Sequence, residues 1–422
     1  MKEQRHNYLI KDKLPSDWDI LPIEKIVAKD KGSIKIGPFG SSLKKEYLVK
    51  EGYKVYGQEN IIEEDFTLGE RFIDRERFEL LRTNEILPGD IVMSMMGTIG
   101  KVLIVPDSIQ KGIMDSHLLR IRLDENLMNK DFFIQLFKDY YPTYKQIQRM
   151  SVGGIMSGLS SSIIRKIKLP VPPLKEQLKI SSILSVWDKA IELKEKLIEQ
   201  KKELKKGLMQ KLLTGEVRLP GFEGEWKEVK LKDLGVLKAG SAFPEKYQNQ
   251  LNGKYPFFKV SDMNNEENEK YMLTANNYIS EDIRTELKAS VIPKNSIVFA
   301  KVGAALFLER KRLLKFDSCI DNNMMALVVK ENIDFSFVYY LLLNMKLSRY
   351  SNVGALPSLN SKDVYSIKCK VPETFEEQKA ISRFLSLFDK EISLLQNELL
   401  SIEQQKKGLM QLLLTGKVRV KV

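Results

Sequence analysis

Two stretches of the chain, residues 176–215 and 377–416, carry the same pattern of apolar and polar positions at a constant offset of 201 residues. Apolar side chains recur in both at intervals of three and four, which predicts long amphipathic helices. Such a stripe is typical of a helix that packs lengthwise against another helix. The expected packing residues are Ile180, Leu184, Trp187 and Ile191 in the first helix and Ile381, Leu385, Phe388, Ile392, Leu395 and Leu399 in the second.

The middle of the first helix breaks this pattern. Three lysines occupy stripe positions there, and a shifted stripe of three leucines fits the apolar residues better. The lysines are Lys194, Lys201 and Lys205, and the leucines are Leu193, Leu197 and Leu204. The pattern therefore leaves the packing register of this segment open.

Paired signals mark the ends of both helices. A proline pair at 172–173 precedes the first, and Thr374 is spaced from Glu377 as in a capping box, so both helices are expected to begin at equivalent places. Gly215 and Gly416 stand where a left-handed residue ends a helix.

Two further glycines, Gly207 and Gly408, fall inside the predicted helices at matching positions. Each costs about 1 kcal/mol relative to alanine, which suggests a kink or the close approach of another backbone. Some 40 residues at 1.5 Å each give rods of roughly 60 Å. We expect two antiparallel helices that form a coiled coil, with one globular domain at each end.

The regions before the helices contain short apolar runs separated by Gly, Pro and Ser, which predicts α+β domains. Residues 86–106 are expected to form a β-hairpin with Gly97, Thr98 and Gly100 at its bend, and residues 130–141 a short helix. The hairpin has a looser counterpart at 291–309. The prediction is two similar globular α/β domains in one repeated fold.

The repeat is also circular. The tail 415–422, if joined to residues 13–20, would recreate the central linker 214–226. The two halves can then be related by a pseudo-twofold axis with the chain ends close together. The predicted division is a first domain at 1–170, a helix at 171–216, a second domain at 217–370, and a helix with its tail at 371–422.

Charge narrows the choice of partner. The chain has 68 Lys and Arg against 56 Asp and Glu, a net charge of +12, as expected of a protein that faces nucleic acid or acidic lipid. Two cysteines without a CxxC pair and a charged N-terminus without an apolar core favour a cytoplasmic protein with no signal peptide. The apolar runs are too short to cross a membrane.

Catalytic motifs are missing from the sequence. There is no GxxxxGK[ST] phosphate loop, and GPFG at 37–40 is not a dinucleotide fingerprint. The only histidines are His6 and His117, so neither a two-histidine metal site nor a Ser-His-Asp triad fits in each half. We expect no catalytic residue and no metal site in this chain.

Polar and basic residues of the variable loops are the candidate contacts to DNA, because Arg, Lys, Asn, Gln and Ser read base edges and hold phosphates. The first half contributes Lys35, Ser41, Ser42, Lys44, Lys45, Gln58, Asn60, Arg71, Arg75 and Arg77. The second half contributes Ser241, Lys246, Gln248, Lys259, Ser261, Lys301, Arg310 and Arg312. No single residue of these is strong evidence for DNA binding; the evidence is that such residues occur together on two matched domains.

These features together resemble the specificity subunit of a Type I restriction-modification system. The resemblance rests on PVPPLKEQLKI at 170–180, VPETFEEQKAI at 371–381, the LLTG helix ends, and the PGDIV...GTIG hairpin. The second hairpin departs from the GTIG form. The resemblance covers essentially the whole chain.

The resemblance implies two target-recognition domains, each reading half of a split site in double-stranded DNA. The helices would act as a spacer and as the docking surface for methyltransferase subunits, two copies expected, and restriction subunits would join the complex. The chain itself would bind no cofactor, while S-adenosylmethionine, ATP and Mg would serve its partner subunits.

Other functions remain open from the sequence. One is a coiled-coil scaffold that does not bind DNA, and another is the recognition subunit of a related split-site restriction-modification enzyme. A self-contained methyltransferase or nuclease is disfavoured by the missing cofactor motifs.

Overall fold

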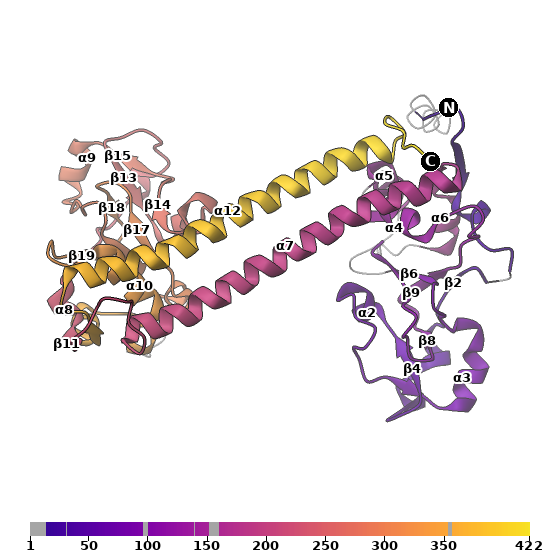
Figure 1. The fold of residues 1–422 in the computed structure, drawn as a ribbon, viewed down its shortest axis with the longest axis horizontal. Helices are drawn as coiled ribbons and strands as arrows, with labels where there is room; N and C mark the ends of the chain where they lie inside the picture. Colours follow the sequence, from indigo (N-terminus) through magenta and orange to yellow (C-terminus); the bar gives the residue numbers. More distant parts are fainter. Residues whose placement is uncertain (1–13, 31, 96–99, 139, 152–159, 353–356) are drawn as a thin grey trace. The chain divides into compact units, whose positions relative to one another are not determined.

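The computed structural model describes residues 14–30, 32–95, 100–138, 140–151, 160–352 and 357–422. The chain divides into two compact units, one of Met1–Glu195 with Glu398–Val422 and one of Lys196–Asn397. The long helices α7 (Leu174–Thr214) and α12 (Phe375–Leu413) each contribute one half to each unit (Figure 1). The two predicted long helices are therefore confirmed, with 41 and 39 residues.

The described residues of the first unit form three small sheets. Strand β1 (Asp19–Pro22) pairs with β10 (Lys168–Val171), and a four-stranded sheet has the order β2 (Ile34–Ile36), β9 (Leu118–Ile121), β6 (Ile91–Ser94), β7 (Val102–Ile104). A further sheet has the order β3 (Leu48–Val49), β5 (Phe72–Ile73), β4 (Tyr53–Tyr56), β8 (Gly112–Met114). The helices are α2 (Gln58–Ile62), α3 (Arg75–Leu81), α4 (Lys130–Lys138), α5 (Tyr141–Ser151) and α6 (Ser161–Lys166).

The second unit repeats this plan. Strand β11 (Lys227–Lys230) pairs with β20 (Lys368–Val371), and the main sheet has the order β12 (Gly235–Ala239), β19 (Met324–Val329), β16 (Ile297–Ala300), β17 (Lys311–Leu314), β14 (Tyr271–Met272). Strands β15 (Tyr278–Ile279), β13 (Tyr255–Phe258) and β18 (Cys319–Ile320) form a third sheet. The helices are α8 (Leu231–Leu234), α9 (Glu281–Glu286), α10 (Phe335–Asn344) and α11 (Ser361–Ser366).

The matched sheets explain the repeated sequence patterns. Strands β6 and β16, with sequences IVMS and IVFA, are buried along their whole length because neighbouring elements cover both faces. The predicted hairpin at 86–106 is confirmed as the antiparallel pair β6 and β7, although Gly97 and Thr98 lie outside the described residues. The predicted helix at 130–141 is confirmed as α4.

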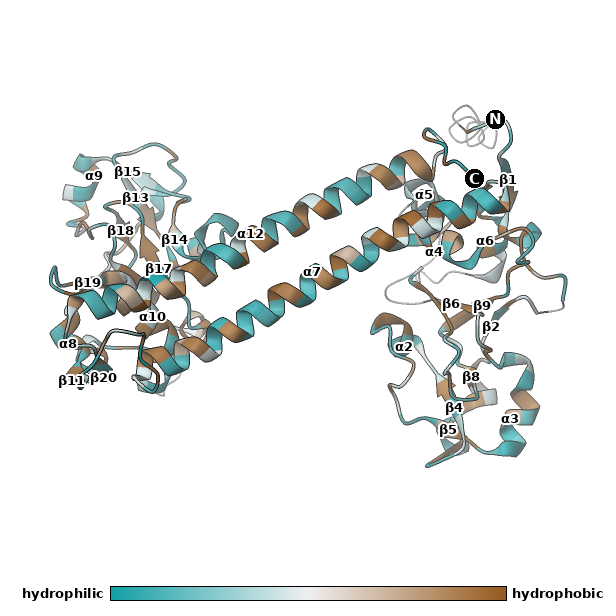
Figure 2. Ribbon diagram, viewed as in Figure 1, coloured by the Kyte–Doolittle hydropathy of each residue, from teal (hydrophilic) through white to brown (hydrophobic). Residues whose placement is uncertain are grey.

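Each unit builds its core partly from the long helices. Ile180 and Leu184 of α7 lie in the core of the first unit together with Met410 and Leu413 of α12. The core of the second unit takes Ile381 and Leu385 of α12 with Met209 and Leu212 of α7. Brown apolar positions recur along both helices among teal polar ones (Figure 2). The ten expected packing residues are all buried or half-buried, and four of them (Ile180, Leu184, Ile381 and Leu385) belong to cores that include residues of the domains as well as of the other helix.

The lysines in the first helix settle its register. Lys194 pairs with Glu398 at 2.8 Å, Lys201 pairs with Glu391 at 2.7 Å, and Lys205 pairs with Asp389. Because the α12 numbers fall as the α7 numbers rise, the helices run antiparallel within each unit. The lysine side chains are only 18% to 28% exposed, so their stems pack in the seam while their amines bind the opposite helix.

The structure excludes one of the alternatives for the seam of the first helix and one for the two helix glycines. The shifted stripe of Leu193, Leu197 and Leu204 does not form the seam, since all three leucines are exposed to solvent. Gly207 and Gly408 are not sites of close approach within the chain, because a Cβ added at either glycine would meet nothing within 4 Å.

Equivalent contacts tie the helix ends to the linker and the tail. In the second unit the Arg218 guanidinium binds Glu377, whose carboxylate also accepts the Trp226 indole N–H. In the first unit Arg419 of the tail binds Glu176, which accepts the Trp18 indole N–H, and Arg419 also binds Asp17. The tail thus makes in the first unit the contact that the linker makes in the second, as the circular repeat predicts. Gly215 and Gly416 have the expected positive φ, +75° and +66°.

Asp389 joins the helix pair to the second domain. Its carboxylate accepts hydrogen bonds from Lys205 on α7, from Lys270 at 2.6 Å and from the Tyr340 hydroxyl of α10 at 2.5 Å. Burial opposes ionisation, but the two lysines outweigh it and lower the pKa of Asp389 below its ordinary value. The counterpart Asp188 is itself more exposed and has two partners, Lys406 at 2.6 Å and Gln135 at 3.0 Å.

We predict that Asp389→Asn lowers the free energy of unfolding by about 2 kcal/mol, because it leaves two partly buried ammonium groups without their counter-ion. The lowered pKa means that this stabilisation is present above the unfolded carboxyl pKa of about 4 and is lost as the pH falls through the folded pKa. Urea denaturation at pH 7 and at points down to pH 3 measures both effects.

Asp188→Asn is the matched control. Its side chain is 47% exposed against 23% for Asp389, so we expect a loss below about 1 kcal/mol. Equal losses for the two variants would contradict the role of Asp389.

Candidate nucleic-acid interface

One edge of the second unit gathers loops from several strands. Ala239 at the end of β12 pairs with Met325 near the start of β19, Ala300 at the end of β16 pairs with Met324, and β17 begins beside the end of β16. The end of β13 lies beside the end of β18 at Ile320, and Ser241 bridges Asp321. The residues that follow or precede these strands therefore meet at a single edge, called here the strand-end edge.

Six of the expected DNA contacts of the second half belong to this edge. They are Ser241 and Gln248 after β12, Lys259 and Ser261 after β13, Lys301 after β16, and Arg310 before β17. The Lys259 amine donates to Gln248 Oε1 at 2.9 Å, and the Arg310 guanidinium donates to Asn264. Lys301 is joined to the turn after β18 through its backbone N–H, which donates to the Asn323 carbonyl at 2.8 Å.

The first unit has the equivalent edge. Ile36 at the end of β2 pairs with Leu119 near the start of β9, and Tyr56 at the end of β4 pairs with Met114. The loop after β2 carries Ser42, Lys44 and Lys45, and Gln58 follows β4. Ser41 lies on the same loop, but its side chain is outside the described part of the structure.

Matching glycines let the first loop of each edge pass close to the turn opposite. A Cβ added at Gly37 would come within 1.9 Å of the Asp115 carbonyl oxygen, and one added at Gly240 within 1.8 Å of the Asp321 carbonyl oxygen. No other residue fits either position. These glycines therefore fix where the polar residues after them are presented.

Asn60 is removed from the expected DNA contacts. It is fully buried, its amide oxygen accepts the Gly57 N–H at 3.0 Å, and its amide nitrogen donates to the carbonyls of Asp65 and Leu68. With these bonds made, Asn60 holds the turn after β4 and has no group left to offer a base.

Arg71 and Arg312 are half-buried, and other groups of their own unit bind their guanidinium groups. Arg71 binds Asp115 at 2.9 Å and Glu59 at 2.8 Å, and these carboxylates raise its pKa although burial lowers it. Arg312 lies within β17, where its Nε donates to the Asn268 carbonyl and burial lowers its pKa. Both guanidinium groups therefore stabilise loops of their own unit, and contacts between either residue and DNA stay predictions.

The remaining expected contacts lie off the loops of the edge or have partners. Lys35 lies within β2 and donates to Thr83 Oγ1 at 2.5 Å, and burial and Arg120 lower its pKa. Arg75 and Arg77 lie on α3, where the Arg77 guanidinium stacks on the Tyr47 ring. Lys246 pairs with Glu286. Contacts between any of these residues and DNA stay predictions.

The sequence did not indicate two groups that shape the edges. Arg120 is 2% exposed and donates to the carbonyls of Gly32, Thr83 and Glu85, which fixes three loops behind the first edge. Asp321 forms the turn beside Ser241, and burial raises its pKa. An arginine in an apolar strand (LLRI) was the available signal for the first.

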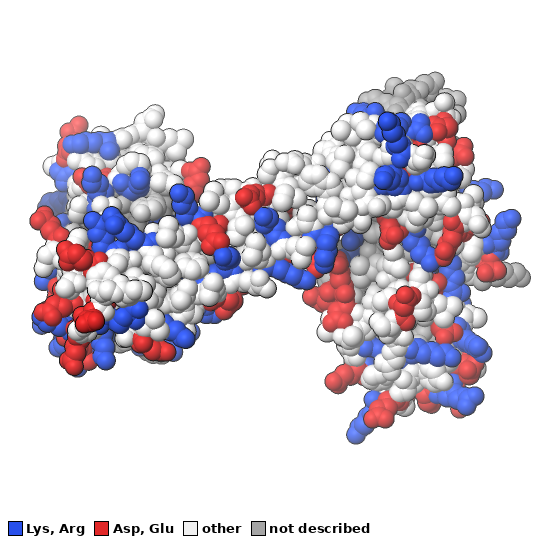
Figure 3. Space-filling view, in the orientation of Figure 1, with Lys and Arg blue, Asp and Glu red and all other residues white. Residues whose placement is uncertain are grey.

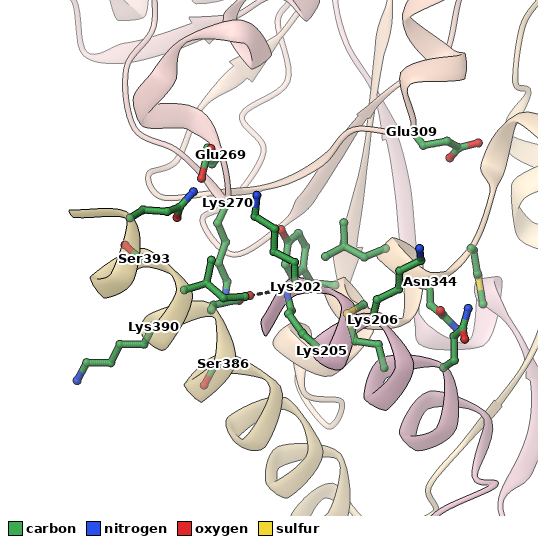
Figure 4. Close-up of a pocket in the computed structure, with 18 of the residues that line it drawn as sticks. Lys202, Lys205, Lys206, Glu269, Lys270, Glu309, Asn344, Ser386, Lys390 and Ser393 are labelled. Carbon is green, nitrogen blue, oxygen red and sulfur yellow. Dashed lines mark hydrogen bonds and ion pairs between the residues drawn. The ribbon is translucent and has the colours of Figure 1, made fainter. Parts of the chain in front are cut away.

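Each unit also has a cavity beside its helix pair. The one in the second unit has about 900 Å³ and lies among Lys202, Lys205 and Lys206 of α7, Ser386 and Ser393 of α12, and Lys270 (Figure 4). The one in the first unit has about 810 Å³. Six identical residue pairs at the offset of 201 line the two cavities: Asp188/Asp389, Ile191/Ile392, Lys205/Lys406, Lys206/Lys407, Met209/Met410 and Gln210/Gln411.

Charge is dispersed over the surface. On the visible face of each unit Lys and Arg lie interspersed with Asp and Glu rather than in one basic patch (Figure 3). Within the described ranges, no three His, Cys, Asp or Glu side chains are placed to hold a metal ion. The described helices include none with the length and apolar character needed to span a membrane.

Comparisons with known proteins agree on one family. A model of the Type I restriction modification DNA specificity domain matches residues 16–203 and 223–404. The putative type I restriction enzyme MjaX specificity subunit of Methanocaldococcus jannaschii is 27% identical over an alignment of 433 positions, which covers 97% of this chain and 95% of that protein. The type I restriction enzyme EcoR124I/EcoR124II specificity subunit of Escherichia coli is 27% identical over an alignment of 240 positions, which covers 53% of this chain and 56% of that protein.

Two solved structures have the same fold. A chain from a study of complex assembly and conformational transition of the type I R-M system aligns with a TM-score of 0.61 at 14% identity, covering 96% of this chain and 100% of that one. The S subunit of a type I restriction-modification system from M. genitalium aligns with a TM-score of 0.54 at 17% identity, covering 96% of this chain and 97% of that one.

We predict that Asn60→Ala lowers the free energy of unfolding of the first unit by about 2 to 3 kcal/mol, because it leaves buried backbone groups without partners. Urea denaturation followed by fluorescence measures the loss. Ser261→Ala, at an exposed position of the second unit, is the control and should change stability by less than about 0.5 kcal/mol. An Asn60→Ala variant of unchanged stability would return Asn60 to the set of surface contacts.

Proposed function

Because the chain belongs to the Type I restriction modification DNA specificity family, we propose that it reads a split target in double-stranded DNA, one half of the target per unit. The observation that carries this proposal is the repeated strand-end edge. Two units of one fold present equivalent edges, but the side chains on them differ, with Lys44 and Lys45 on the first and Lys259 and Arg310 on the second. Two domains with the same backbone fold but different side chains at the edge are suited to reading two different half-sites.

The proposed role is recognition without catalysis by this chain. Methylation with S-adenosylmethionine, and ATP- and Mg-dependent translocation and cleavage, would belong to the modification and restriction subunits. The helices α7 and α12 would set the separation of the half-sites, since at 1.5 Å per residue they are about 60 Å long. A scaffold that does not bind DNA is the competing proposal.

Exposed apolar residues on the long helices are the proposed docking surface for modification subunits. Val186 and Leu193 on α7 are 66% and 54% exposed, and their counterparts Leu387 and Leu394 on α12 are 64% and 55% exposed. Residues seven apart lie on one helix face, so each pair forms an apolar stripe. Uncovered stripes of this kind favour burial against another protein.

The repetition of the stripe gives the proposed stoichiometry. Two copies of one partner need two equivalent surfaces, and the pairs Val186/Leu387 and Leu193/Leu394 follow the offset of 201 residues. Gly207 and Gly408 add to this argument. Neither glycine is required by any neighbour within 4 Å, so each leaves room for the backbone of a partner.

Exchange of residues 15–169 for the first domain of another family member tests the recognition of DNA. We predict that one half of the methylated sequence changes and the other half stays, because each unit reads its own half-site. Methylation mapping of host DNA measures the result when the chain is expressed with its modification subunits. A change in both halves would contradict the division of labour, and a chain without salt-sensitive binding to duplex DNA would favour the scaffold.

The double variant Leu387→Ser/Leu394→Ser tests the docking surface. We predict that the purified complex falls from two modification subunits to one, as measured by native mass spectrometry, while the stability of the free chain changes by less than about 0.5 kcal/mol. Leu251→Ser, at a residue 71% exposed outside the helices, is the control and should leave both copies bound. A variant that keeps two copies would exclude this surface.

A further inference from the structure

We infer that Phe307 and Leu308 form an apolar wedge that enters a base step of the duplex read by the second unit. This inference rests on the proposed recognition of DNA and assigns to that site a contact of a different kind. Phe307 and Leu308 are adjacent, and each is 58% exposed. They end the short 3-10 helix Ala304–Leu308, which connects β16 to β17.

Phe307 and Leu308, called here the tip, lie at the strand-end edge of the second unit. Strand β16 ends and β17 begins there, and Phe299 of β16 pairs with Lys311 of β17. Lys301, directly after β16, also accepts the Leu359 N–H through its carbonyl and donates its own N–H to the carbonyl of Asn323. The tip therefore belongs to the group of loops that carries Ser241 and Lys259.

The tip is held firmly on both sides. Gly303, with φ of +75°, donates its N–H to the Pro357 carbonyl at 2.8 Å, and the side chain of Leu306 is buried in the core beneath. On the other side Glu309 is left-handed, with φ of 53°. A left-handed residue other than glycine is kept only where the surrounding structure demands it.

Contacts of the Glu309 side chain hold this residue in its left-handed conformation. Its carboxylate accepts the backbone N–H groups of Leu347 at 3.0 Å and Ser348 at 2.9 Å, and the ammonium of Lys311 at 2.5 Å. Lys311 is 1% exposed and also donates to the Met345 carbonyl at 2.9 Å. Although burial raises it, these bonds lower the pKa of Glu309, which is therefore charged at neutral pH. The two large apolar side chains are thus exposed to solvent on a backbone that these bonds hold in place.

The chemistry around the tip favours nucleic acid over a protein partner. Lys301 and Arg310 stand on either side of it in the chain, as phosphate contacts would flank an inserted side chain. Proteins that bend DNA insert Phe or Leu between base pairs and unstack them, and a tip of two residues matches one such step. A protein interface would need a wider apolar surface around the tip.

The test uses the chain in complex with its modification subunits and a duplex that carries the motif found by methylation mapping. Phe307→Ala/Leu308→Ala should weaken binding to this duplex by about tenfold or more, because the inserted apolar surface is lost. It should also reduce the bend measured by energy transfer between fluorophores at the duplex ends. The dependence of affinity on salt should stay the same, since no phosphate contact is removed.

Two controls separate a wedge from a change in folding. Phe316→Ala removes an aromatic side chain that is 51% exposed beyond the other end of β17, and should leave affinity and bending unchanged. Phe307→Leu keeps an apolar tip and should retain most of the bend. Because the tip is exposed, the alanine pair should also leave the midpoint of urea denaturation unchanged.

The outcomes are distinct. A parent complex that binds no duplex contradicts the proposed function itself. A parent complex that binds and bends the duplex, with an alanine variant that does the same, overturns the wedge alone. An alanine variant that keeps DNA binding but loses a modification subunit also overturns it, since the tip would then contact protein.

Discussion

The pairing of charged side chains across the seam of the two long helices is the constraint on which the fold depends. An apolar stripe alone allows antiparallel helices to slide by a heptad at little cost, because each leucine finds an equivalent neighbour. Lysines within the stripe remove this freedom, since a partly buried ammonium group needs a carboxylate opposite it. Lys194 and Glu398 meet that need in the first unit, and Lys201 and Glu391 meet it in the second.

Register in turn positions the domains on their own helix ends. Asp389 can bind Lys205 only at one register, and it then also holds Lys270 of the domain and Tyr340 of α10. At the far end of each pair, an arginine from the linker or the tail binds the glutamate that begins a helix, as Arg218 does with Glu377. The same contact serves both units because the chain repeats circularly.

Much of this architecture could be predicted from the sequence. The repeat, the two helices, their glycine ends and the hairpin all leave local patterns that one chain displays. The helix register could not be predicted, because the acids that bind Lys194 and Lys201 lie on another helix and follow no apolar period of their own. Leu193 fitted an apolar stripe in the sequence, yet its side chain is 54% exposed, and it belongs to the proposed docking surface.

Residue type alone selects the candidate contacts to DNA, and it does not show in which direction each side chain points. Asn60 has the chemistry of a base contact, yet its amide closes a turn and is fully buried. Arg71 is bound by Asp115, a residue distant in sequence. Phe307, by contrast, has no polar group that would mark it as a DNA contact in the sequence, although the loop that carries it lies at the strand-end edge. Side-chain direction follows from backbone caps and distant charges, which composition does not encode.

Zero-length carbodiimide cross-linking of the intact chain, followed by peptide mass spectrometry, tests the helix register most directly, because it joins an amine only to a carboxylate in contact with it. We predict amide links between Lys194 and Glu398 and between Lys201 and Glu391. High salt should abolish these links only if it separates the two helices. Links from the same lysines to carboxylates of α12 one heptad away would contradict it.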